Sequence, residues 1–287
     1  MVVWRLVPFH RYPARENMAI DEAIFREMQR SVGPPTIRLY GWLSPAVSIG
    51  YFQHIDREID LEVCRKSGIA VVRRPTGGKA VYHDDDLTYA VIARENTSLF
   101  PPTILGTYRV ISQCLVEGLR KLGLEAVLAS DGRETEEESP DASCFSVPSL
   151  HELLVKGRKI CGSAQMRSRG AFLQQGSLLM SFDPGKTCDV TLPHREPRAM
   201  QVQSLQEKVT SLNEHLPRSI TREDICKSLI EAFETGWEAS FAEGSLTPEE
   251  EKLKDRLLET KYGDLARGHA PEARRERCVS PEESKGR

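Results

Sequence analysis

The chain lacks the features that would place it in a membrane, outside the cell or on nucleic acid. No run in its 287 residues approaches the roughly 20 consecutive apolar residues that span a bilayer. The opening residues, MVVWRLVPFHRYPAR, have neither the basic start nor the apolar centre of a signal peptide, so we expect a cytoplasmic protein. A formal net charge of only −3 gives no overall field that would attract nucleic acid or a membrane surface.

Cysteine is sparse and carries no pairing pattern. The seven cysteines form no CxxC pair, and no spacing of His, Cys and acidic residues matches a metal site, so we expect no metal. An odd number of cysteines without a secretion signal is typical of free thiols in a reducing compartment. Most such thiols are small buried hydrophobic groups, which leaves room for one with a chemical role.

The glycine-rich phosphate motifs are also missing. No G-x-G occurs in the chain, and the nearest match to a Walker A loop fails because Ala80 follows Gly78-Lys79. The stretch RRPTGGKAVYHDDDLTY nevertheless contains Gly77-Gly78, which permits positive φ and leaves backbone N–H groups uncovered beside Arg73. From this stretch alone, a tight turn between strands and a ligand-binding loop are equally open interpretations.

The pattern of apolar residues predicts a mixture of hairpins and helices. Helical spacing with start and stop signals predicts helices at 17–30, 104–122, 220–237 and 247–263. Apolar and β-branched runs predict strands within 36–53, 68–75 and 87–94, followed by three strands at 150–155, 158–166 and 171–180 joined by short turns. Residues 131–143 are expected to form an exposed acidic loop, and 184–219 are less regular. This mixture predicts an α+β fold with a largely antiparallel sheet flanked by helices.

Four stretches together resemble the lipoate–octanoate attachment family, which is related to the biotin protein ligases. They are RRPTGGKAVYHDDDLTY, GRKICGSAQ, LQQGSLL and KVTSLNE, and they occur between residues 73 and 213 in the order that the family shows. The resemblance implies a biotin/lipoate protein ligase-like catalytic domain over residues 1–265, with a helical C-terminal end from about residue 220. Residues 268–287 have almost nothing to bury, so we expect a disordered tail there.

A cysteine–phenylalanine pair indicates the branch of the family. Ligases of the family use ATP, whereas one octanoyltransferase branch carries a CF pair upstream of the GRK stretch, where this chain has Cys144-Phe145. The resemblance therefore implies transfer of octanoyl from acyl carrier protein, through a cysteine thioester and without a cofactor, to a lysine of a lipoyl domain. The glycine cleavage H protein or a dehydrogenase E2 component would be the acceptor.

Three other functions stay open at this point. A sister enzyme type moves octanoate between lipoyl domains, and its motifs do not separate it from this chain. An ATP-dependent lipoate–protein ligase would have the same fold, with Cys144 incidental. A catalytically silent acyl-binding module would need neither Cys144 nor Lys159, and the presence of both argues against it.

The resemblance implies catalytic roles for Cys144 and Lys159. A thiolate can attack a thioester and leave again, but a free thiol needs a nearby cation to ionise at neutral pH. Lys159, in the GRK stretch, would either lower the pKa of Cys144 or stabilise the oxyanion of the tetrahedral intermediate. Cys161 is a rival nucleophile, because strand alternation puts it on the same face as Lys159. A thiol in the middle of a strand is usually packed, so Cys144 is favoured.

The resemblance also implies an acyl pocket built from the glycine-rich stretch and the later strands. His83 has two interpretations, a proton acceptor or a hydrogen-bonded structural histidine, and the second is favoured. Asp84 to Asp86 are expected to form a solvated turn. The implied acyl- and substrate-binding residues are Arg73, Gly77, Gly78, Tyr82, His83, Gly162, Ser163, Ala164 and Gly176.

Both implied partners are acidic, so we expect a local basic patch that receives them. Its candidate members are Arg73, Arg74, Lys79, Arg158, Arg167 and Arg169.

Overall fold

The computed structural model describes residues 3–30, 33–129, 152–192 and 196–263. Within these ranges the helices are α1 Ala14–Arg30, α2 Ile55–Glu58, α3 Leu61–Lys66, α4 Ile104–Lys121, α5 Pro184–Val190, α6 Arg198–Lys208, the 3-10 turn Leu212–Glu214, α7 Arg222–Trp237 and α8 Pro248–Thr260. The strands are β1 Val3–Tyr12, β2 Thr36–Trp42, β3 Ala46–Ile49, β4 Ala70–Arg73, β5 Val81–His83, β6 Asp86–Arg94, β7 Val127–Leu128, β8 Leu153–Val155, β9 Arg158–Ser168, β10 Ala171–Leu179 and β11 Ser240–Glu243.

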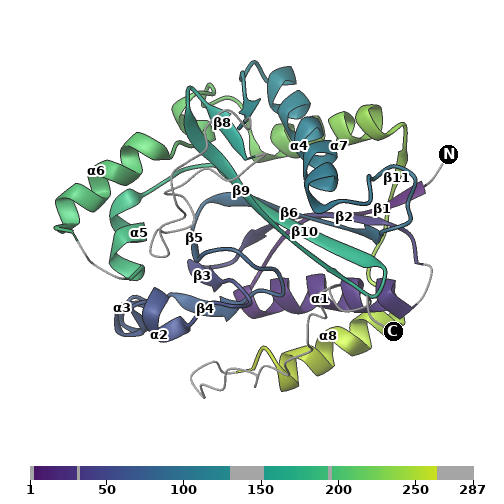
Figure 1. Cartoon of the computed structure of the whole chain (residues 1–287), viewed down its shortest axis with the longest axis horizontal. Helices are drawn as coiled ribbons and strands as arrows, with labels where there is room; N and C mark the ends of the chain where they lie inside the picture. The colour runs from purple at the N-terminus through teal and green to yellow at the C-terminus, as the bar shows by residue number, and fades with distance from the viewer. Residues whose placement is uncertain (1–2, 31–32, 130–151, 193–195, 264–287) are drawn as a thin grey trace, which may run out of the picture.

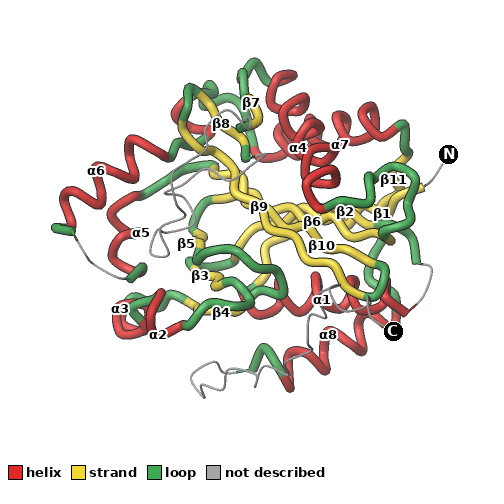
Figure 2. Tube along the Cα trace, viewed as in Figure 1, coloured by secondary structure: helices red, strands yellow, loops and turns green. Residues whose placement is uncertain are grey.

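The strands of the described residues form one large sheet and one small sheet (Figure 2). The large sheet has eight strands in the order β11-β1-β2-β6-β10-β9-β8-β7, and only the β11–β1 and β1–β2 pairs are parallel. The small sheet has the order β4-β3-β5. The expected α+β fold with a largely antiparallel sheet is therefore confirmed.

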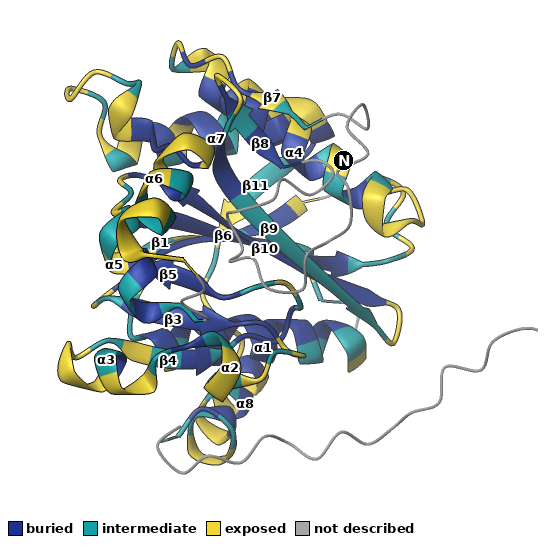
Figure 3. Cartoon of the chain, turned by 60° about the vertical axis from the view of Figure 1, so that its left-hand side comes forward, coloured by how far each residue is buried: buried dark blue, intermediate teal, exposed yellow. Residues whose placement is uncertain are grey.

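Helices cover both faces of the large sheet (Figure 1). On one face α4 and α7 bury a core with Phe172, Trp4 and Phe233. On the opposite face α1 and α8 pack around Tyr40 and Trp42. Each face of the central strands is thus buried, which explains why β2 and β10 are buried along their whole length rather than at alternate residues (Figure 3).

Local sequence signals account for the boundaries of several elements. Thr221 and Thr247 each form a capping box with the acidic residue three positions later, at the starts of α7 and α8. The β8–β9 and β9–β10 hairpins turn through Lys156-Gly157 and Arg169-Gly170, and all four of these residues have positive φ. Two successive positive-φ residues match the right-handed twist of the flanking strands.

The C-terminal elements are joined to the N-terminal strand. β11 pairs in parallel with β1, and Arg5 on β1 donates two hydrogen bonds of 2.6 and 2.7 Å to Glu250 on α8. Both side chains of this ion pair are buried. The first strand is therefore held to both the last strand and the last helix, although Arg5 and Glu250 are 245 positions apart in the sequence.

Two expectations from the sequence are wrong. Residues 184–219 contain two regular helices, α5 and α6, rather than irregular chain. Asp183 is the N-cap of α5, and its side chain accepts a hydrogen bond from Lys186 N–H. Asp84 is exposed, but Asp86 is 2% exposed and begins strand β6, so the three aspartates do not form one solvated turn.

Among the described residues, no helix has the length and apolar character needed to cross a membrane. The expected loop 131–143 and tail 268–287 lie outside the described residues.

Candidate active-site cavity

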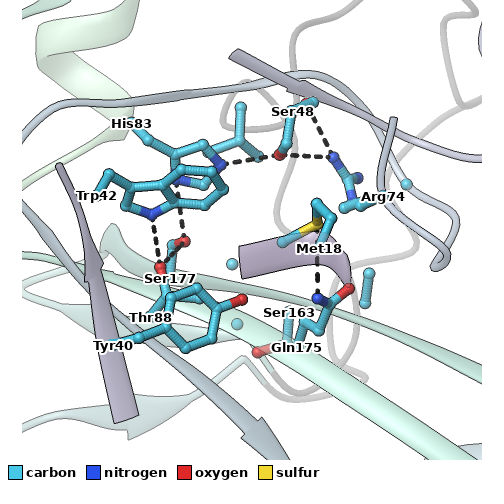
Figure 4. Close-up of a pocket in the computed structure, with 15 residues that line it drawn as sticks. Met18, Tyr40, Trp42, Ser48, Arg74, His83, Thr88, Ser163, Gln175 and Ser177 are labelled. Atoms are coloured by element: carbon cyan, nitrogen blue, oxygen red, sulfur yellow. Dashed lines mark hydrogen bonds between the residues drawn. The ribbon is translucent and has the colours of Figure 1, made fainter. Parts of the chain in front are cut away.

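A cavity opens between the large sheet and the small sheet (Figure 4). It contains about 420 Å³ of space not filled by protein atoms, and part of this space is open solvent. The start of α1, strands β2, β3, β5, β6, β9 and β10, and the loop between β4 and β5 all contribute to it. The lining residues are Met18, Tyr40, Trp42, Ser48, Arg74, Gly78, Val81, His83, Thr88, Gly162, Ser163, Ala164, Gln175, Gly176 and Ser177.

Gly78 forms part of the cavity wall, at a place where a side chain would be strained and crowded. Its φ is +86°, and a Cβ there would lie 2.9 Å from Arg74 Nη2 and 3.7 Å from the Cβ of Ala164. Arg74 is buried and donates hydrogen bonds to the backbone carbonyls of Gly77, Lys79 and Ser48. The guanidinium therefore holds the glycine loop against strand β3, and both sides of this contact are fixed.

The floor of the cavity depends on a second glycine. A Cβ at Gly176 on β10 would lie 2.3 Å from Tyr89 Cε1 and 2.6 Å from Ser163 Oγ. The Tyr89 hydroxyl and Ser163 Oγ are 2.7 Å apart, so the missing side chain leaves room for this hydrogen bond. Gln175 next to it donates to Asp21 and accepts from Thr76 Oγ1, which ties the loop before Gly77 to the sheet.

A chain of hydrogen bonds leads from the cavity into the protein through His83. Ser48 Oγ is 2.8 Å from His83 Nε2, and His83 Nδ1 is 2.9 Å from Asp86 Oδ2. The imidazole is stacked on Trp42 with 3.8 Å between ring centroids and 19° between ring planes. All three polar side chains are buried, at 2%, 3% and 2% exposure. The histidine ring is thus held both in its plane and at each of its nitrogens.

Asp86 is an ionised partner at the inner end of this chain. Burial acts to raise the pKa of Asp86, but the charge of His83 and hydrogen bonds from His83, Ser177 and Thr88 outweigh burial and lower it below its ordinary value. The other carboxylate oxygen, Oδ1, is buried and has no hydrogen-bond partner among the described residues. A carboxylate in this setting holds the Nδ1 proton of the histidine in place.

Lys159 is buried on β9 and pairs with Glu152. Its Nζ donates to Glu152 Oε1 at 2.5 Å, and its side chain is fully buried. Cys161, two residues along the strand, is 1% exposed, and its Sγ is 4.0 Å from Ser163 Oγ. Burial raises the pKa of the Cys161 thiol to about 12, against the lowering effects of Ser163 and Lys159. At neutral pH the Cys161 side chain is therefore a neutral thiol.

The structure brings together most of the pocket residues that the sequence indicated. Six of them line the cavity, namely Gly78, His83, Gly162, Ser163, Ala164 and Gly176. Three do not: Arg73 donates to the carbonyls of the 50–53 loop, Gly77 lies beside the wall, and Tyr82 faces a second, acidic hollow that also contains Asp84 and Lys186. Cys144 lies outside the described residues.

The basic residues expected to form a patch differ in exposure. Arg74 is buried, Arg169 is exposed, and the other four are partly buried, namely Arg73, Lys79, Arg158 and Arg167. Arg73 and Arg74 bind backbone carbonyls, and Arg167 donates to Pro102 O and Thr103 O. Arg158 is paired with Glu214 at 2.8 Å. These four side chains thus hold loops and strands together, and Arg74 is the one of them that is buried.

The sequence patterns did not indicate that Ser48, Arg74 and Asp86 take part in the cavity and its hydrogen-bond chain. Ser48 is one hydroxyl in an apolar strand and had no local signal. Asp86 could have been found from its spacing, because His83 and Asp86 flank the two-residue turn between β5 and β6 and must therefore lie close together.

Comparison with known proteins identifies the family of this chain. The model for the lipoyl protein ligase A/B catalytic domain matches residues 13–234. The octanoyltransferase LipM of Geobacillus kaustophilus is 40% identical over 267 residues, covering 91% of this chain and 95% of the relative. That of Bacillus subtilis is 40% identical over 264 residues, covering 90% and 95%. The chain belongs to the lipoyl protein ligase A/B catalytic domain family, as the four sequence stretches implied.

Solved structures agree with this assignment. A bi-partite lipoate protein ligase of Thermoplasma acidophilum, studied with its E2 lipoyl domain, superposes with a TM-score of 0.76 at 29% identity and covers 91% of this chain and 94% of its own. A lipoate-protein ligase A bound with ATP gives a TM-score of 0.76 at 28% identity and covers 92% and 98%. This chain thus shares its fold with solved lipoate ligases while its sequence relatives are octanoyltransferases, so the fold alone does not define the reaction.

Proposed function

We propose that the chain is a cysteine octanoyltransferase that moves octanoyl from acyl carrier protein to a lysine of a lipoyl domain. The octanoyl group is carried as a thioester on Cys144, and its tail occupies the cavity beside Gly78. Support comes from the likeness to octanoyltransferases named LipM over about nine tenths of the chain, and from the Cys144-Phe145 pair in the motif position. The acceptor is the glycine cleavage H protein or an E2 component.

The burial and the raised pKa values of the described thiols support Cys144 as the nucleophile. Cys64, Cys114, Cys161 and Cys188 are buried, and Cys226 is partly buried. Burial raises the pKa of every one of these five, for example to about 11 for Cys64 and Cys226. A nucleophilic cysteine needs the opposite shift, toward the thiolate. The nucleophile is therefore sought among the two cysteines outside the described residues, and only Cys144 stands in the family motif.

We also propose that residues 1–265 act as one catalytic domain and that it works in the cytoplasm. The pairing of β11 with β1 and the buried Arg5–Glu250 ion pair support inclusion of the C-terminal elements in this domain. Free thiols among the described residues are typical of a reducing compartment.

The central experiment separates the transferase from a ligase of the same fold. The full chain is incubated with octanoyl acyl carrier protein and an apo lipoyl domain in the absence of ATP and magnesium, and intact masses are recorded. We expect an octanoyl adduct on the enzyme with carrier protein alone, and octanoyl on the lipoyl domain when both are present. Transfer from free octanoate that requires ATP, with no adduct from carrier protein, would make the chain a ligase.

A substitution at Gly78 is expected to shift the preference for acyl chain length. A valine at Gly78 is strained at φ +86° and projects toward Ala164 and Arg74, so the cavity becomes shorter. Each buried methylene contributes about 0.8 kcal/mol, so losing two of them lowers the octanoyl-to-butanoyl preference about tenfold. Competition between octanoyl and butanoyl carrier protein measures this ratio.

Gly77 offers a matched control for that experiment. A Cβ at Gly77 meets no atom within 4 Å, and its φ is not positive, so Gly77→Val is expected to keep the wild-type ratio. An unchanged ratio in Gly78→Val would mean that the acyl tail lies elsewhere. If Gly78→Val instead lost an ATP-dependent reaction, the loop would be a phosphate-binding loop.

A further inference from the structure

A chain of three hydrogen-bonded side chains at the cavity has no role in the formation of the thioester as described above. Ser48, His83 and Asp86 come from strands β3, β5 and β6, and they form a continuous chain with contacts of 2.8 and 2.9 Å. Ser48 and His83 line the cavity, whereas Asp86 does not (Figure 4). A buried histidine that connects a cavity-facing hydroxyl to a carboxylate can accept a proton from the cavity side through that hydroxyl.

Arg74 contributes a second contact at Ser48. An arginine can only donate, and its Nη1 lies 3.2 Å from Ser48 Oγ, so the Ser48 oxygen accepts there. The same oxygen keeps a second lone pair, so the donor and the acceptor in its 2.8 Å contact with His83 Nε2 are set by the histidine tautomer. In the tautomer with its proton on Nδ1, His83 donates to Asp86 Oδ2 and accepts from the Ser48 hydroxyl at Nε2, which lies one hydroxyl away from the cavity.

The second half of the proposed reaction needs such an acceptor. A lysine amine has an ordinary pKa of about 10.4, so at neutral pH it enters as an ammonium and cannot attack a thioester. Lys159 is held by Glu152 in a buried contact of 2.5 Å and is not among the residues that line the cavity. Cys161 is a neutral thiol that has no capacity to accept one.

We propose that Ser48, His83 and Asp86 form a proton relay that deprotonates the acceptor lysine of the lipoyl domain; this rests on the proposed function. The ammonium gives a proton to Ser48 Oγ as the Ser48 hydroxyl proton passes to His83 Nε2, and Asp86 stabilises the resulting imidazolium. The amine nitrogen then forms its bond to the thioester carbonyl carbon and the carbon–sulfur bond breaks. The second nitrogen proton goes to the departing thiolate, and the relay returns its proton to solvent.

Two acceptors of different basicity test the relay. Wild type and Ser48→Ala are loaded with octanoyl from carrier protein and then discharged by an apo lipoyl domain or by hydroxylamine, which is already neutral at about pH 7. We expect Ser48→Ala to lower the ratio of the lipoyl-domain discharge rate to the hydroxylamine discharge rate about 10²-fold. Ser48→Thr restores the hydroxyl and is expected to recover most of the transfer to lysine.

A distant serine controls for the loss of one buried hydrogen bond. Ser228 on α7 is 6% exposed and donates to Gly118 O at 2.7 Å, away from the cavity, so Ser228→Ala is expected to behave as wild type in both discharges. Equal slowing of both acceptors in Ser48→Ala, or no slowing of either, overturns the relay and leaves His83 a structural residue. Octanoyl found on the peptide that contains Ser48 also overturns it. If the wild-type protein never takes up octanoyl from carrier protein, the proposed function itself is wrong. If it takes up octanoyl but Ser48→Ala does not distinguish the lipoyl domain from hydroxylamine, only the relay is wrong.

Discussion

Cys144→Ala is expected to abolish octanoyl transfer and to leave the enzyme without an octanoyl adduct. A thioester forms only on a sulfur that is ionised and accessible, and burial keeps all five described thiols protonated at neutral pH. Removing Cys144 therefore removes the cysteine of the Cys-Phe pair that marks the transferase branch. The measurement is the intact mass after incubation with octanoyl carrier protein, followed by peptide mapping of the adduct.

Cys161→Ser provides the comparison for Cys144→Ala. Cys161 lies beside the cavity, two residues from Lys159, and is the thiol that a search by proximity would choose. Because its pKa is raised to about 12, we expect Cys161→Ser to keep most of the transfer activity. An octanoyl group mapped to Cys161, or turnover that survives in Cys144→Ala and is lost in Cys161→Ser, would reverse the assignment.

The sequence predicted the elements whose signals are local. The two hairpins around Lys156-Gly157 and Arg169-Gly170 were predictable because short turns with glycine define both the turn and the register of the strands. Helices α7 and α8 were predictable because Thr221 and Thr247 start them with capping boxes. These features depend on residues within a few positions of one another.

Features that depend on distant partners were not predictable in the same way. Strand β11 is four residues long and is stabilised by pairing with β1 at the other end of the chain. The arginines show the same limit at the site. Arg73 ends strand β4 and Arg74 follows it, so the two side chains diverge, and only Arg74 reaches the cavity wall. Which of two adjacent arginines faces a cavity is set by the strand opposite, not by the motif.

Lys159→Ala is expected to reduce octanoyl loading of the enzyme by about 10²–10³-fold, because a preorganised cation is lost from the thiolate or the oxyanion. The same substitution leaves Glu152 buried without its lysine, and breaking a buried pair from one side typically costs about 3–5 kcal/mol of stability. A slow variant could therefore be a partly unfolded one. Rates have to be compared at a temperature where thermal unfolding shows the variant to be folded.

Glu250→Gln separates these two effects, because it breaks a comparable buried ion pair far from the cavity. Arg5 and Glu250 are 2.6 Å apart, with side-chain exposures of 8% and 7%, and neither lines the cavity. We expect Glu250→Gln to lower the unfolding temperature while folded protein loads octanoyl at the wild-type rate. In Lys159→Ala both the unfolding temperature and the octanoyl loading rate should fall.

Adding Glu152→Gln to Lys159→Ala neutralises the carboxylate that has lost its lysine, so stability should recover while loading stays slow. If loading recovers with stability, Lys159 is a structural residue, and the thiolate is activated by another group.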